Sequence, residues 1–449
     1  MSNLLVWLDK YDSYVLVGSL TQDPKNPSEA SFAYDPAYFK DEHSFAISCS
    51  LPLHSEPFSL ETTRNFFSAL MPDGKFRKSF ASANHISIND FVSYLSLLNN
   101  ETIGSLIFTE ENKFPDTHPA YEPFTEKDFN EFANHPLQKA SENSTRSRLS
   151  LAGSMAKIGL YKSSDGSWYL PSGTAPSTHI IKAGFEYNNL SINEAICLTV
   201  SQKLGLSDFN FELIPVSNFG PLLAIERFDR YFPSSPEYID GLARPGRIHQ
   251  EDFCQALNLH EDFKYETKDM NYLLDIKELL EEQTFTPLVE KDKFIKQLMF
   301  DFLIGNCDNH LKNYSIIFNT ALNSKELSPH YDAVSTTYYA LDPCMGIPLS
   351  DNRSIETVSR QSLQTRIIDF CGSSEYYLEI FDSFRLQIPD LVSDASKHFC
   401  NDGFVWAKDT GEYLINNFKR RMEQFDLNSQ DSHSPIGDDG SSRPQRQKE

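Results

Sequence analysis

The sequence predicts an α+β fold in which a β-rich N-terminal part is followed by a mainly helical C-terminal lobe. Up to about residue 248, short apolar runs of strand length alternate with turns that contain Gly and Pro. Beyond that point the apolar residues recur at the spacing of an amphipathic helix. The chain has 449 residues and 40% hydrophobic content, enough for about two to four domains with packed cores.

We expect five segments along the chain. Residues 1–110 form an N-terminal α/β subdomain, and residues 111–147 form a polar connector with four prolines. Residues 148–248 form a second strand-rich unit, and residues 249–427 form a helical lobe. Residues 428–449, rich in Ser, Asp and Gln, are expected to be a disordered tail.

Local patterns predict the elements of the first two segments. Residues 4–8 and 14–20 flank a short polar stretch and predict a β-hairpin. Residues 62–70 have apolar side chains at helical spacing and stop at the turn signal of residues 71–74. We also expect a helix at residues 87–98, a strand at 103–108 and one connector helix at 126–133.

The charge balance disfavours direct binding to nucleic acid. Lys and Arg number 40 against 63 Asp and Glu, so the formal net charge is −23. Such a surface repels the phosphate backbone over its average face. The one basic patch, Lys419-Arg420-Arg421, is most simply the solvated end of a helix.

The cysteines and the apolar runs indicate a reducing, aqueous compartment. The seven cysteines are scattered and form no C-x-x-C pair, which predicts free thiols rather than disulfides or a zinc site. No apolar run is long enough for a secretory signal or a membrane span. We therefore expect a cytoplasmic protein, and we leave export to a host cell open.

The loop after residue 304 carries the strongest chemical signal. An apolar helical run ends at Gly305, and the following residues include groups that act on protons, metals and phosphates. Asp308 and Asn313 have the D-x-x-x-x-N spacing of the base and the metal-binding amide in phosphoryl-transfer loops. His310 and Lys312 lie between them. The same residue types are common in surface loops, so the motif needs support from the rest of the chain.

Residues that could act on a phosphate together with this loop lie upstream of it. A small-residue turn at residues 149–154 can bring backbone N–H groups close to a phosphate, although a plain hairpin loop is the simpler interpretation. The next apolar strand ends in Lys182, in the place of a phosphate-pairing lysine. Glu194 opens the following helix. It can form a capping box with Ser191 or an ion pair with Lys182, and the two do not exclude one another.

Further candidate nucleotide- and metal-binding residues lie before and after the loop. A buried strand at residues 222–225 leads into Glu226 and Phe228, where backbone groups can hold an adenine. Asp332 lies at the far end of a strand predicted after the loop, in the place of the second metal-binding acid of a kinase. The flanking elements are helices at residues 250–257, 270–280 and 291–303, strands at 314–318 and 328–334, and mainly helices up to about residue 425.

Together these parts follow one another in the order found in a protein kinase, and the motifs resemble those of the HipA family of bacterial serine/threonine kinase toxins. The resemblance covers roughly residues 1–425. It rests on residues 149–153, 178–182, 226–230, 250–257, 303–315 and Tyr331-Asp332, and in the N-terminal part on residues 50–53, 66–72 and 103–104.

The resemblance implies a kinase-like fold and an enzyme that uses ATP and Mg²⁺ to phosphorylate a protein serine or threonine. It also implies the toxin of a toxin–antitoxin pair. The expected target is an aminoacyl-tRNA synthetase, and the expected partner is a small helix-turn-helix antitoxin through which alone DNA would be contacted.

By position, the resemblance implies a role for each residue of the site. Asp308 matches the catalytic base, and His310 and Lys312 complete the catalytic loop motif. Asn313 and Asp332 match the Mg²⁺ ligands.

The nucleotide-binding positions are implied in the same way. Lys182 matches the phosphate-binding lysine, and Glu226 and Phe228 match the adenine-contacting hinge. Ser150 matches the serine at which family members autophosphorylate, which ejects the nucleotide loop and shuts the enzyme down. The loop itself comprises Ser150, Ala152, Gly153 and Ser154.

The chain departs from the family pattern within that loop. The family usually has Ala-Gln-Glu-Lys where this chain has Ser154-Met155-Ala156-Lys157. The lost amide and carboxylate would weaken phosphate contacts, so a pseudokinase that acts as a binding module or co-repressor is an alternative. A small-molecule kinase is a third possibility, disfavoured by the N-terminal unit and by the motif match.

Overall fold

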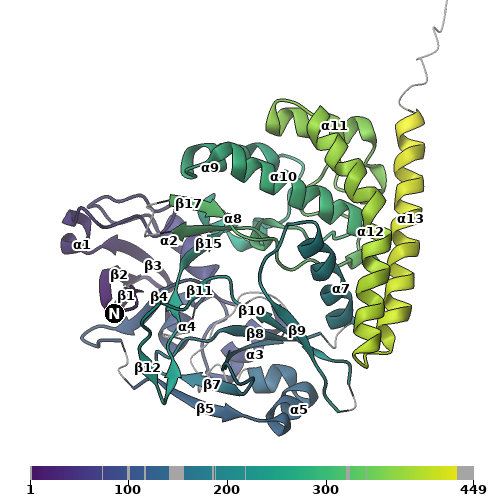
Figure 1. The fold of residues 1–449 in the computed structure, drawn as a ribbon. Coiled ribbons are helices and arrows are strands. Elements are labelled where there is room, and N and C mark those ends of the chain that lie inside the picture. The colour runs from purple at the N-terminus through teal and green to yellow at the C-terminus, as the bar shows by residue number, and fades with distance from the viewer. Residues whose placement is uncertain are drawn as a thin grey trace, which may run out of the picture.

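The computed structural model describes residues 3–72, 74–98, 102–115, 118–140, 156–184, 187, 189–217, 219–319, 324–339 and 341–431. The predicted α+β fold is confirmed, with a strand-rich first half and a helical second half (Figure 1). Within the described residues, no helix is long and apolar enough to cross a membrane.

The N-terminal unit is a four-stranded antiparallel sheet with helices packed on it. Its strands, in the order β3-β2-β1-β4, include the predicted hairpin, which is confirmed. The side chain of Ser59 accepts a hydrogen bond from Thr62 N, so α2 begins earlier than residue 62. The elements are β1 (Asn3–Asp9), β2 (Tyr14–Asp23), β3 (Asn26–Tyr34), β4 (Leu106–Glu110), α1 (Pro36–Lys40), α2 (Leu60–Ser68), α3 (Gly74–Ala83) and α4 (Phe91–Leu98).

A six-stranded sheet in the order β5-β7-β6-β8-β10-β9 follows. Alternate residues of β10 face opposite cores: Leu222 and Ala224 pack with α5, and Leu223 and Ile225 pack with α7. The elements are β5 (Ala120–Phe124), α5 (Glu126–Asn134), a helical segment at residues 136–140, β6 (Ala156–Lys162), β7 (Trp168–Ser172), β8 (His179–Ala183), α7 (Leu190–Lys203), β9 (Phe211–Ile214) and β10 (Leu222–Glu226).

Two features of this sheet differ from the expectations. Residues 120–124 were expected within a connector, yet they pair with β7 as the edge strand β5. Ser191 lies inside α7, whose N-cap is Asn189, so Ser191 and Glu194 cannot form the capping box. Glu194 instead meets Lys182, the other arrangement that the sequence left open.

The helical lobe includes a three-stranded sheet, β15-β16-β17, on its side next to the N-terminal unit, and ends in the helices α11, α12 and α13 at the edge of the molecule (Figure 1). Its helices are α8 (Phe253–Ala256), α9 (Tyr272–Gln283), α10 (Pro287–Ile304), α11 (Arg360–Cys371), α12 (Glu375–Asn401) and α13 (Trp406–Asp431). The strands are β15 (His249–Asp252), β16 (Ser315–Asn319) and β17 (Ser324–Leu327). The 3₁₀ turns are η1 (Glu261–Phe263), η2 (Leu311–Asn313), η3 (Thr336–Tyr338) and η4 (Ile355–Thr357). Two small ribbons precede the lobe, β11 (Arg230–Tyr231) with β14 (Gly246–Arg247) and β12 (Tyr238–Ile239) with β13 (Leu242–Ala243).

Three expectations for this lobe were wrong in detail. Residues 250–257 are not one helix, because Asp252 and Gln255 form a reciprocal capping box that starts α8 only at Phe253. The second strand after the loop is β17, at residues 324–327, whereas residues 328–334, where that strand was expected, are irregular. Helix α13 continues to Asp431, so residues 428–431 are helical rather than part of a tail.

Buried polar contacts join the N-terminal unit to the rest of the chain. Arg244 Nη2 binds both oxygens of Asp9, at 3.0 and 2.9 Å. Glu251 of β15 is completely buried and accepts hydrogen bonds from Ser48 Oγ at 2.5 Å and from Cys49 N at 2.8 Å. Burial raises the pKa of Glu251 to about 7, although these hydrogen bonds act in the opposite direction.

Glu251 should make stability depend on pH. Its folded pKa lies above the unfolded value of about 4.3, so the folded protein binds more protons and its free energy of unfolding falls as the pH rises through about 5 to 7. As the pH goes from 5 to 8, we expect the free energy of unfolding of Glu251→Gln to rise by about 1 to 3 kcal/mol relative to that of the wild type. Urea unfolding of both proteins at those pH values measures this. Glu412→Gln, at an exposed position, is the control; an equal pH dependence in all three proteins would contradict the expectation.

Candidate active site

The loop that carries the D-x-x-x-x-N motif begins where α10 ends. Gly305 adopts a left-handed conformation with φ of +77°, and a Cβ there would collide with Thr337 Oγ1 and with the guanidinium of Arg421. The predicted helix stop at Gly305 is therefore confirmed. Glycine is needed here both for the conformation and for the close approach of α13.

Asp301, a buried carboxylate on α10, fixes both ends of the loop. It accepts hydrogen bonds from Asn306 Nδ2 at 2.8 Å and from Tyr314 OH at 2.6 Å, on either side of the motif. His330 Nε2 lies 3.2 Å from the same carboxylate, just before Asp332 in the sequence. One side chain thus positions the loop and the approach to Asp332.

Within the loop, Asp308 and Asn313 are joined directly. Asn313 Nδ2 donates to the main-chain oxygen of Asp308 at 2.7 Å, and Asp308 N donates to Asn306 Oδ1 at 3.0 Å. The Asp308 side chain is 48% exposed and lines a cavity. Tyr265 OH donates a hydrogen bond to Asp308 Oδ1.

Lys182 is the centre of a buried charge cluster. Its Nζ lies 2.5 Å from Glu194 Oε1 and also contacts Asp332 Oδ1. Burial alone would lower the pKa of Lys182, but Asp332 and Glu194 outweigh it and raise that pKa. Burial would likewise raise the pKa of Asp332, but Lys182 and Lys157 hold it well below its usual range. Lys182 and Asp332 are therefore both charged at neutral pH.

Lys157 was missed among the predicted site residues. It lies on β6 directly opposite Lys182 on β8, and both lysines line the cavity. Like charges opposite one another in a sheet are unfavourable unless anions lie nearby. Asp332 and Glu194 supply these anions, so the two lysines and the two carboxylates form one charge cluster on this side of the cavity. The sequence signal for Lys157 was that it lies in the same strand-rich segment, residues 148–248, as Lys182.

His310 and Lys312 line the cavity, but Lys312 Nζ is engaged elsewhere and His310 Nδ1 is buried without a hydrogen-bond partner. Burial lowers the pKa of His310 to about 4, so the ring is neutral at pH 7. Its Nε2 lies 3.8 Å from Asp308 Oδ1, too far for a hydrogen bond. Lys312 Nζ donates to Ala69 O of the N-terminal unit at 3.2 Å, and Glu261 Oε2 lies 3.6 Å away.

The hinge residues Glu226 and Phe228 line the same cavity. The Glu226 carboxylate accepts a hydrogen bond from Asn210 Nδ2 at 2.5 Å. The Phe228 ring lies 5.5 Å from Tyr331 and 6.2 Å from Phe209, centroid to centroid. The predicted loop residues Ser150, Ala152, Gly153 and Ser154 lie outside the described residues.

The cavity that these residues share has a volume of about 900 Å³, within the range of sites for small ligands. Asp332 and Asn313 offer it a carboxylate and an amide, oxygen ligands that suit Mg²⁺. No group of three or more His, Cys, Asp or Glu suited to a metal occurs among the described residues. Mg²⁺ in proteins often has only one or two protein ligands and completes its coordination with phosphates and water.

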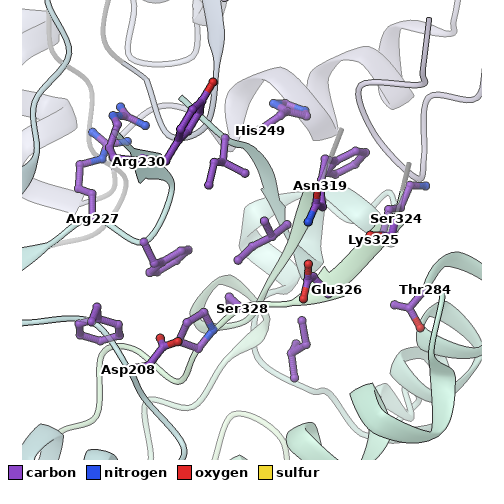
Figure 2. Close-up of a pocket in the computed structure, with 18 of the residues that line it drawn as sticks. Asp208, Arg227, Arg230, His249, Thr284, Asn319, Ser324, Lys325, Glu326 and Ser328 are labelled. Atoms are coloured by element: carbon purple, nitrogen blue, oxygen red, sulfur yellow. The ribbon is translucent and has the colours of Figure 1, made fainter. Parts of the chain in front are cut away.

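A second cavity of about 1430 Å³ lies between the N-terminal unit, the hinge and β17. Figure 2 shows Arg227 and Arg230 on one side of it and Asn319, Ser324 and Lys325 on the other. Of the predicted site residues that the structure describes, only Glu226 and Phe228 line both cavities. The hinge is therefore the wall between them.

Arg421, part of the predicted solvated basic patch, turns toward the catalytic loop. Its Nη2 donates to Leu303 O at 2.7 Å and its Nη1 to Thr337 Oγ1 at 3.2 Å. Burial lowers its pKa to about 10, so it is still charged at neutral pH. A cation at the C-terminal end of α10 also complements the helix dipole. The expectation of a solvated patch was therefore wrong for Arg421.

Comparison with known proteins gives consistent matches over both halves. The HipA N-terminal domain family matches residues 4–109, and the HipA-like C-terminal domain family matches residues 149–390. Y4mE of Sinorhizobium fredii, a provisionally named kinase, is 32% identical over 380 residues, 81% of this chain and 84% of its own. The serine/threonine-protein kinase toxin HipA of Shewanella oneidensis is 28% identical over 318 residues, 67% of this chain and 70% of its own.

A chain from the solved complex of Shewanella oneidensis HipA, HipB and operator DNA has the same fold. The TM-score is 0.75 at 22% sequence identity, and the match covers 96% of this chain and 98% of that chain.

The contacts of Arg421 predict how the loop responds to its removal. Arg421→Met loses two hydrogen bonds from a charged donor, each worth about 1.5 to 3 kcal/mol. We expect amide exchange at residues 305–313 to become at least about tenfold faster, measured by hydrogen–deuterium exchange. The control is Arg420→Met, at the exposed neighbouring position of the same helix. Equal protection of the loop in both variants would show that Arg421 does not brace it.

Proposed function

The chain belongs to the HipA family of kinase toxins, and from this premise we propose that it is a serine/threonine protein kinase dependent on ATP and Mg²⁺. The observation that carries the proposal is the single cavity lined by Asp308, Asn313, Asp332 and the Lys182–Glu194 pair. These are the parts required for phosphoryl transfer, which depends on placement and charge neutralisation.

In this proposal each polar group has one task. Asp308 accepts the proton of the acceptor hydroxyl, and Asn313 and Asp332 hold the metal. Lys182 and Lys157 bind phosphate oxygens, and Glu194 keeps Lys182 in place. Bound Mg²⁺ supplies positive charge that offsets the charge on the transferred group.

The remaining predicted residues position the nucleotide and the loop. We assign Glu226 and Phe228 to the adenine side of the cavity, and Ser150, Ala152, Gly153 and Ser154 to the phosphate side. Lys312 and His310 have a supporting role: Lys312 joins the catalytic loop to the N-terminal unit through Ala69 O, and His310 packs against Tyr265.

The family membership also supports a toxin–antitoxin assignment. The structural neighbour forms a complex with HipB and operator DNA. We propose a small helix-turn-helix antitoxin as partner, with DNA contacted only through it, in keeping with the net charge of −23. An aminoacyl-tRNA synthetase is the first target to examine, and it would place the enzyme in the cytoplasm.

The second candidate is a pseudokinase that binds ATP without transferring it. It is favoured by Ser154-Met155-Ala156, where the family pattern has an amide and a carboxylate. Calorimetry with Mg·ATP, combined with a transfer assay, separates the two candidates: binding without transfer favours the pseudokinase.

Replacing the base tests the kinase proposal. Asp308→Asn keeps the shape of the side chain but cannot accept a proton at neutral pH. Transfer from labelled ATP to lysate proteins should fall by about 10²- to 10⁴-fold, while Mg·ATP binding stays within a few-fold of the wild type. Asp262→Asn, whose side chain is 81% exposed, should leave both unchanged. A wild type that labels no protein, itself included, would refute the kinase function.

Ser150 is the proposed site of autophosphorylation. After incubation with Mg·ATP, mass spectrometry of the wild type should find a phosphate on Ser150, and Ser150→Ala should lack it. The variant should also stay active for longer, because its nucleotide loop cannot be ejected. Phosphate found only at other residues of an active wild type would contradict this assignment.

A further inference from the structure

Tyr265, on the segment between η1 and α9, holds the carboxylate of the proposed base. Its hydroxyl donates a hydrogen bond to Asp308 Oδ1, although the two residues are 43 positions apart. Among the described residues, no other side chain donates a hydrogen bond to this carboxylate, since His310 Nε2 is 3.8 Å away. The Asp308 side chain is 48% exposed, so packing alone does not fix its orientation.

The tyrosine ring is itself held firmly. It meets the ring of His310 edge to face, with centroids 5.0 Å apart and an interplanar angle of 83°. The Arg353 guanidinium lies 5.4 Å from its centroid, and Lys264 Nζ lies 5.5 Å from it. Burial keeps His310 neutral, so the ring beside Tyr265 packs without adding a charge.

The backbone on both sides of Tyr265 is tied to the catalytic loop. Lys264 O accepts from Leu311 N at 3.1 Å, and Glu266 N donates to Gly346 O at 3.0 Å. Gly346 N in turn donates to Asn309 Oδ1 at 2.8 Å. Tyr265 therefore moves with the loop and is a fixed support rather than a mobile lid.

We propose that Tyr265 is a positioning residue for the base, a role that rests on the proposed kinase function. By occupying Oδ1, its hydroxyl fixes the rotation of the carboxylate and presents Oδ2 to the acceptor. Oδ2 takes the acceptor proton as the new O–P bond forms and the bond from the γ-phosphorus to the leaving ADP oxygen breaks. The proton then passes to solvent.

This role makes one prediction for Tyr265→Phe. Loss of orientation should lower kcat by about 10- to 100-fold while the KM for Mg·ATP stays within about twofold. A merely structural role would change kcat and KM together.

Tyr34→Phe is the matched control. It removes the same atom from a buried tyrosine of the N-terminal unit, whose OH donates to Leu51 O at 2.6 Å. We expect its kcat and its KM for Mg·ATP to match the wild type. Incorporation of 3-fluorotyrosine at position 265 keeps the hydroxyl that donates to Asp308, and the ¹⁹F resonance of this residue should shift when Asp308 is changed to Asn.

An active wild type with a Tyr265→Phe variant of equal or greater kcat would overturn the role of Tyr265 alone. If Tyr265→Phe does not fold, a fluorotyrosine resonance that Asp308→Asn leaves unmoved would overturn it. A wild type without any phosphoryl transfer would overturn the kinase function and this role with it.

Discussion

The architecture depends on one buried cation. Lys182 comes from β8, Glu194 from α7 and Asp332 from the irregular segment after β17, and all three meet within contact distance. An unpaired charge in such a position costs several kcal/mol. The six-stranded sheet, helix α7 and the helical lobe are therefore held in one arrangement.

The C-terminal helices make that arrangement rigid. Helix α7 packs against α12 and α13, and most of its residues are buried, Glu194 included (Figure 1). Arg421 of α13 reaches the end of α10 and Thr337. Glu194 and the catalytic loop are thus braced by the same pair of helices, so closure of the site by a swing of α7 would need a repacking of the whole lobe.

Local signals predicted much of this from the sequence. The hairpin and the helix stop at Gly305 follow from spacing and from residue conformation, and both are confirmed. The family resemblance is confirmed as well. The predicted site residues that the structure describes all line one cavity. The order of the motifs along the chain predicted this, because it is the order in which a kinase-like fold brings such residues together.

What the sequence could not settle depends on partners distant in the chain. Residues 120–124 form strand β5 because they pair with β7. Arg421 points inward because its guanidinium donates a hydrogen bond to Leu303 O. Asp332 has a φ of +51°, a conformation that surrounding contacts must impose. Asp301 did leave a signal, because it is the one acid in the otherwise apolar stretch of residues 298–304, whereas Tyr265 left none that spacing could reveal.

The proposed kinase function requires Lys182 to exchange its contact with Asp332 for one with a phosphate oxygen when the nucleotide binds. A crystal structure with Mg²⁺ and a non-hydrolysable ATP analogue tests this exchange. We expect Lys182 to stay paired with Glu194 and to contact a phosphate oxygen, with the metal on Asp332 and Asn313. An analogue bound elsewhere, or an unbroken Lys182–Asp332 contact beside bound nucleotide, would contradict it.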